Sequence, residues 1–127
     1  MVYFLAHKHP VNYILKLMKN LWIYILITSR GHFYTGWTTD LKRRFREHES
    51  GKNGAKYTRA FKAQKIAMSW SIQGSRSDAL RIEAFIKKQS RKKKQEYIDH
   101  PERLNEELIQ SGNEVSDEMK WDTGNAV

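Results

Sequence analysis

The stretch at residues 21–28 constrains the fold of this chain more than any other. It reads Leu-Trp-Ile-Tyr-Ile-Leu-Ile-Thr, so apolar, aromatic and β-branched residues stand at odd and even positions alike. Successive side chains of a strand point to opposite faces, and a strand that is apolar on both is typical of the centre of a covered sheet. Its apolar run is also far shorter than the roughly twenty residues of a membrane-spanning helix. We therefore expect a buried central strand in a soluble protein that makes no membrane contact.

Two further strands follow from turn and alternation signals. Ser29-Arg30-Gly31 predicts a turn, and residues 33–35 then form the returning strand of a hairpin. Apolar and polar residues alternate over residues 66–72, which predicts a third strand.

Capping residues and glycines place three helices around these strands. Residues 38–40 offer side-chain oxygens before a helix at 41–49, and Gly51 ends it. Ser75, Ser77 and Asp78 precede a helix at 79–88, and Ser90 precedes another at 91–98.

The predicted order is ββαβαα, in a chain of 127 residues, which is the size of one domain. Helices between strands favour an α/β or α+β domain with a small three-stranded, mostly antiparallel sheet flanked by helices. We place that domain at residues 21–98. Residues 1–20 form an N-terminal extension with a short amphipathic helix after Pro10, and residues 99–127 form an acidic tail.

Charge divides the chain into two unequal parts. Residues 1–98 hold 21 Lys and Arg against 6 Asp and Glu, a net charge of +15, whereas residues 99–127 hold 2 against 8, a net charge of −6. A field of this size indicates a polyanionic partner, because each neutralised phosphate releases counterions. Nucleic acid is the partner we expect, and an anionic membrane or a merely solvated basic surface are the alternatives. The tail is a helix, a disordered solubiliser or an internal mimic of nucleic acid.

The chain has no cysteine. That absence excludes a disulfide scaffold, a thiolate zinc finger and a cysteine nucleophile, and it suits a reducing compartment, with the cytoplasm as the expected location.

The helix at 41–49 places two polar side chains beside its apolar stripe. At about 100° per residue, Leu41 and Phe45 define the stripe, Arg44 and His48 follow one edge, and Arg43 faces water. Arg44 can therefore present its guanidinium to a phosphate, or its stem can pack over the rim of the core. His48 is equally open to a functional role or to that of a satisfied boundary histidine.

Glu83 lies at the edge of the apolar face of the helix at 79–88. A carboxylate there is costly unless it is paired or bound to a cation. It is a ligand for Mg²⁺, which takes one or two carboxylates with waters and phosphate oxygens, or it forms an ion pair with Arg44 or Lys87.

The hairpin brings two phenols to one face of the sheet. If its turn centres on Arg30, residue i opposes residue 60 − i, so that Tyr34 faces Leu26 and Gly36 faces Tyr24. Tyr24 and Tyr34 then share a face, with a glycine leaving space beside one of them. The pair either hydrogen-bonds a water and a phosphate or is simply packed.

Several short motifs follow one another along the chain: Tyr24, Tyr34-Thr35-Gly36, Asp40-Leu41-Lys42-Arg43-Arg44-Phe45-Arg46-Glu47-His48, Ser50-Gly51-Lys52, Gly54-Ala55-Lys56-Tyr57-Thr58-Arg59 and Ala79-Leu80-Arg81-Ile82-Glu83. This ordered set resembles the GIY-YIG nuclease superfamily over about residues 21–98. It is most similar to small bacterial stand-alone members related to the N-terminal catalytic domain of excinuclease C.

The resemblance implies an endonuclease that hydrolyses phosphodiester bonds with one Mg²⁺ or Mn²⁺ ion, and a place in DNA repair. Its catalytic residues would be Tyr24 at the attacking water, Tyr34 and Arg44 at the phosphate, His48 as an assisting group and Glu83 as the metal ligand. The implied contacts to the nucleic-acid backbone are Lys52, Lys56, Arg59 and Lys87.

The chain departs from the family pattern in three places. Trp22 stands where the motif has its first glycine, and the second half of the motif reads Tyr-Thr-Gly. Several relatives have a downstream active-site asparagine that this sequence does not place, and Asn105 is the nearest candidate.

We expect DNA in preference to RNA. A binding module with the same fold that cleaves poorly is the alternative, and a basic interaction protein whose acidic tail recruits a protein partner is a third reading.

Overall fold

The computed structural model describes residues 19–51, 62–113 and 119–123 of the chain. Its sheet consists of β1 (Lys19–Thr28), β2 (Phe33–Thr38), β3 (Ala63–Gly74) and β4 (Lys120–Thr123). Its helices are α3 (Leu41–Ser50), α5 (Arg76–Lys87), α6 (Arg91–Asp99) and α7 (Glu102–Gln110). The predicted ββαβαα order is confirmed, and the chain beyond residue 98 adds α7 and β4 to it. The helix expected after Pro10 lies outside the described residues.

The sheet is antiparallel throughout, in the order β2-β1-β3-β4. β1 is its centre, as the two-sided apolar pattern predicts. The hairpin has the expected register, because Tyr24 pairs with Gly36 and Leu26 with Tyr34. Four strands replace the expected three, since β4 pairs with the outer edge of β3.

The helices α3, α5 and α6 begin where side-chain caps satisfy their first backbone amides. Asp40 accepts from the amide of Arg43 at the start of α3, and Ser75 and Asp78 form a reciprocal capping box at the start of α5. Ser90 caps α6 through the amide of Lys93. The box explains why α5 begins at Arg76, earlier than its apolar pattern indicates. Gly51 ends α3 with a φ of 73°, a left-handed conformation that favours glycine.

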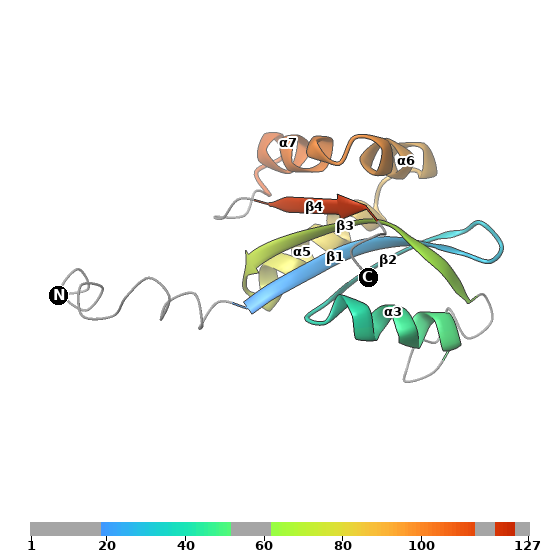
Figure 1. Ribbon diagram of the computed structural model, residues 1–127. Helices are drawn as coiled ribbons and strands as arrows, with labels where there is room; N and C mark the ends of the chain where they lie inside the picture. The colour runs from blue at the N-terminus through green and yellow to red at the C-terminus, as the bar shows by residue number, and fades with distance from the viewer. Residues whose placement is uncertain (1–18, 52–61, 114–118, 124–127) are drawn as a thin grey trace, which may run out of the picture.

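The sheet is covered on both faces, by α3 on one and by α5, α6 and α7 on the other (Figure 1). Side chains from alternate positions of β1 supply both cores. Ile23 and Ile25 pack beneath α5, α6 and α7, and Tyr24 and Leu26 pack beneath α3. Within the described residues, no helix is long and apolar enough to span a bilayer.

Candidate active site

Tyr24 lies on the face of the sheet that α3 covers, and it is buried. Its ring extends across Gly36, the residue that it opposes on the edge strand β2. A β-carbon added at Gly36 would lie 2.5 Å from the Tyr24 hydroxyl oxygen, which is too close for any side chain. The backbone of Gly36 is not in the left-handed region, so glycine is required here for space.

His48 holds the hydroxyl of Tyr24. The Tyr24 oxygen and Nε2 of His48 are 2.8 Å apart, and the imidazole is completely buried. Burial and the nearby positive charge of Arg44 lower the pKa of His48 to about 4, although Glu47 opposes them. His48 is therefore neutral at pH 7. The Tyr34 ring completes this group, with its centroid 4.9 Å from that of the His48 ring.

Arg44 lies beside the same phenol. Its guanidinium donates to Oε1 of Glu47 at 2.9 Å and to the Tyr24 oxygen. Burial alone would lower the pKa of Arg44, but these hydrogen bonds outweigh it and raise the pKa above its ordinary value. Arg44 is thus a permanent positive charge held in a fixed direction.

The direction of the hydrogen bond between Tyr24 and His48 depends on where their protons lie. Burial raises the pKa of Tyr24, and the hydrogen bond from Arg44 offsets part of that rise, so the phenol is protonated at neutral pH. In the neutral His48 tautomer that carries its proton on Nδ1, the Tyr24 O–H group donates to Nε2 while Arg44 donates to the Tyr24 oxygen. The three side chains form a directed chain of hydrogen bonds that ends on a base.

Glu83 comes from α5, the helix on the opposite face of the sheet. α5 packs against β1 and the edge strand β2. Burial is the main reason why the pKa of Tyr24 is raised, and the negative charge of Glu83 makes a small further contribution in the same direction. Its carboxylate therefore acts electrostatically on the same phenol as Arg44 does. Oε1 of Glu83 is 3.3 Å from the Lys87 ammonium, whose side chain is half exposed. Of the two partners that the sequence allows for an ion pair, Lys87 is the one observed.

A single protein carboxylate, that of Glu83, suits a cation that keeps most of its water ligands. Within the described residues, no group of three or more His, Cys, Asp or Glu side chains forms a metal cage. Mg²⁺ and Mn²⁺ fit a single carboxylate supplemented by waters and phosphate oxygens, whereas a structural Zn²⁺ requires a closed set of ligands. The ion pair with Lys87 is partly exposed and therefore weak, so it does not prevent Glu83 from binding a cation.

The other predicted contact residues are distributed unevenly. Lys87 lies beside Glu83 and is exposed, while Lys52, Lys56 and Arg59 lie outside the described residues. Asn105 belongs to α7, which packs on the face opposite to Tyr24. Sequence reasoning missed Glu47, which orients Arg44, and its spacing of three residues from Arg44 on one helix is the signal that would have found it.

Comparison with known proteins places the whole group inside one domain. The GIY-YIG catalytic domain model matches residues 20–97, which include the five catalytic candidates. A UPF0213 protein of Syntrophus aciditrophicus is 42% identical over 88 residues, which are 68% of this chain and all of that protein. The UPF0213 protein SAG0778 of Streptococcus agalactiae is 46% identical over 77 residues, which are 61% of this chain and 85% of that protein.

One solved structure is also similar in sequence to this chain. The solution NMR structure of the UPF0213 protein BH0048 from Bacillus halodurans is 38% identical to this chain and has a TM-score of 0.39. The match covers 70% of this chain and 96% of the other. The name UPF0213 states no substrate or reaction.

Proposed function

Because this chain belongs to the family of GIY-YIG catalytic domains, we propose that it is a divalent-metal-dependent endonuclease that hydrolyses phosphodiester bonds, in DNA in preference to RNA. One observation carries the proposal. A buried phenol, Tyr24, is shared between a fixed guanidinium and a neutral imidazole. Packing alone does not account for such a set, since burying polar groups is costly.

Tyr24 and His48 activate the attacking water. As the water attacks phosphorus, its proton passes to the Tyr24 oxygen while the Tyr24 proton passes to Nε2 of His48. The net result is one proton on His48 and a new bond between phosphorus and the water oxygen. The bond from phosphorus to the leaving oxygen breaks, and that oxygen takes a proton from solvent. A low pKa keeps His48 free to accept the proton at neutral pH.

Arg44 and Tyr34 hold the scissile phosphate. The guanidinium of Arg44 has five N–H donors, so the bonds to Glu47 and Tyr24 leave donors for phosphate oxygens. Its direction is fixed before the substrate binds, which makes it effective against the charge that develops on phosphorus. Tyr34 lies beside the His48 ring and presents a second phenol on the same face.

Glu83 would hold the divalent ion, with water and phosphate oxygens as the other ligands. Such an ion, when bound, supplies positive charge to the phosphate and the leaving oxygen. Lys87 would then leave its ion pair with Glu83 and contact a phosphate of the nucleic-acid backbone. On the resemblance alone, Lys52, Lys56 and Arg59 are proposed as further backbone contacts.

The test is a nicking assay on supercoiled plasmid and on a mixed RNA, with Mg²⁺ and with Mn²⁺. Wild type cleaves, and Glu83→Gln and Arg44→Ala each lose about 100- to 1,000-fold in rate, the cost of removing one preorganised charge from a transition state. Arg43→Ala is the matched control, because Arg43 is the exposed neighbour of Arg44. We expect it to change the rate by less than about threefold.

Two results decide against the proposal. Equal losses in Arg43→Ala and Arg44→Ala would mean that only the overall charge matters. Tight, salt-sensitive binding by wild type, with no cleavage in either metal, would favour a nucleic-acid-binding module of the same fold.

A further inference from the structure

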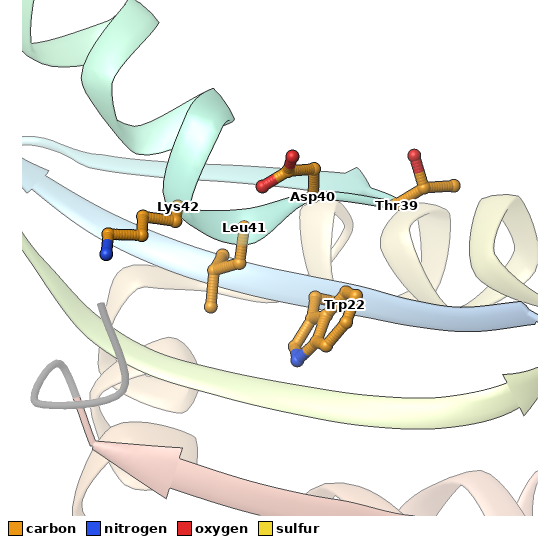
Figure 2. A pocket seen from close by; sticks show the side chains of 5 residues that line it. All are labelled: Trp22, Thr39, Asp40, Leu41 and Lys42. Carbon is orange, nitrogen blue, oxygen red and sulfur yellow. The ribbon is translucent and has the colours of Figure 1, made fainter.

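A hollow of about 320 Å³ lies at the start of α3, on the face of the sheet that holds Tyr24. Its lining residues are Trp22, Thr39, Asp40, Leu41 and Lys42. Figure 2 shows the indole of Trp22 beside the Leu41 side chain, with the Lys42 side chain beyond Leu41. An aromatic ring and an aliphatic group thus meet a positive charge in one open depression.

The hollow is close to the proposed site of cleavage. Trp22 and Tyr24 are two residues apart on β1 and share a face, so their backbones are separated by about 7 Å. A substrate with its scissile phosphate at Tyr24 would therefore have a neighbouring nucleotide within reach of the hollow.

The chemistry of the lining favours a base over a phosphate. Trp22 and Leu41 offer a flat apolar surface, and the carboxylate of Asp40 repels an anion. The start of α3 is not a free anion site either, because Oδ1 of Asp40 already accepts from the Arg43 amide. Lys42 is exposed at the edge, where it suits the phosphate attached to a base inside the hollow.

From these features we infer that the hollow binds one unpaired base of the substrate, stacked on Trp22, next to the scissile phosphate. The inference rests on the proposed function and specifies its substrate class: nucleic acid with a single-stranded segment beside the cleaved bond. A base inside a continuous duplex is stacked between its neighbours, so it cannot enter the hollow without being extruded.

The experiment measures binding by the full chain, without divalent metal, to oligonucleotides that carry 2-aminopurine in a single-stranded overhang or inside a duplex. Stacking on Trp22 lowers the 2-aminopurine fluorescence in the overhang and leaves it unchanged in the duplex. Trp22→Ala weakens overhang binding about tenfold, as expected for the loss of one base–aromatic stack, and changes duplex affinity by less than about twofold. Trp22→Phe retains a stacking ring and most of the affinity.

The controls separate stacking from folding and from charge. Trp22 also packs against the core beneath α3, so the Tm of each variant is measured and the comparison rests on Trp22→Phe if Trp22→Ala is unstable. Lys42→Ala lowers the salt dependence of overhang binding by about one unit, and Lys65→Ala, an exposed lysine on β3, does not. Equal losses for overhang and duplex, or unchanged fluorescence in the overhang, would overturn the inference. Because this experiment measures binding and not cleavage, it tests base stacking on Trp22 even if the nuclease assay fails.

Discussion

The two faces of β1 are built differently. Among the residues that the structure describes, the side chains that point toward α5, α6 and α7 join a cluster of thirteen buried residues, and those that point toward α3 join a cluster of five. The larger cluster is almost entirely apolar, whereas the smaller lies against the buried imidazole of His48 and includes the phenol of Tyr24. The difference teaches that burial of apolar side chains on one face offsets the free-energy cost of holding polar groups in fixed, buried positions on the other.

The largest effect is expected when the hydroxyl of Tyr24 is removed from the face that α3 covers. Tyr24→Phe lowers the cleavage rate about 1,000-fold, because proton transfer through the phenol is lost, and it lowers the free energy of unfolding by only about 1 kcal/mol. Tyr97→Phe is the matched control, since the Tyr97 hydroxyl donates to Glu107 at 2.6 Å on the other side of the sheet. It has a similar cost in stability and leaves cleavage unchanged. Equal cleavage losses in the two variants would break the comparison.

The next largest effect is expected when a buried side chain is shortened on the face that α5, α6 and α7 cover. Ile82→Ala lowers the free energy of unfolding by about 3 kcal/mol, because Ile82 is completely buried and a cavity remains. Cleavage by the folded fraction stays within about twofold, although Glu83 is the adjacent residue. Leu80→Ala on the exposed side of α5 serves as the reference, and denaturant titration with a rate assay at low denaturant measures both. A large loss of rate in Ile82→Ala would show that the two faces are not separable.

The third effect is a pH dependence that belongs to the polar face. His48 has a pKa of about 4 in the folded protein, against an ordinary value of about 6.5, so at intermediate pH the unfolded chain binds a proton that the folded chain does not. Stability from this group is therefore complete above pH 6.5 and is lost as the pH falls toward 4, by about 3 kcal/mol in all. His48→Asn removes this component. Wild-type and variant curves that fall in parallel between pH 7 and 4 would contradict it.

The smallest effect is expected at the ion pair between Lys87 and Glu83 on α5. Lys87→Ala removes a positive charge 3.3 Å from the Glu83 carboxylate and tightens Mn²⁺ binding about fivefold, which corresponds to about 1 kcal/mol for one partly exposed ion pair. The free energy of unfolding changes by less than about 0.5 kcal/mol. Lys88→Ala removes a neighbouring exposed charge and leaves Mn²⁺ affinity near that of wild type. Calorimetry without nucleic acid measures both, and identical affinities in the two variants would exclude Glu83 as the metal ligand.

Local signals predicted much of this molecule. The turn at Ser29-Arg30-Gly31 fixes the register of the hairpin, so the pairing of Tyr24 with Gly36 follows by counting. The helical period likewise separates Arg44, which contacts Tyr24, from its exposed neighbour Arg43. Both inferences need only a few residues of context, because a turn or a helix sets its own geometry.

Features that depend on distant parts of the chain could not be predicted in this way. β4 is four residues long, and its pairing with β3 is set by tertiary packing, so no periodic pattern indicates it. The wheel places Glu83 at an edge of α5, but it does not say that α5 crosses near the edge strand β2 and so brings Glu83 within electrostatic range of Tyr24. The hollow at Trp22 joins β1 to the start of α3 and needs both elements in place.

The missing side chain at Gly36 has a consequence for which related sequences can keep a tyrosine at the position of Tyr24. The phenol oxygen of Tyr24 fills the volume in which any other residue would have its β-carbon. A descendant that gains a methyl group at this position must therefore displace its tyrosine or lose it. Under the proposed function, the two aligned positions, the glycine and the tyrosine opposite it, would thus separate related sequences that can cleave from those that retain only the scaffold.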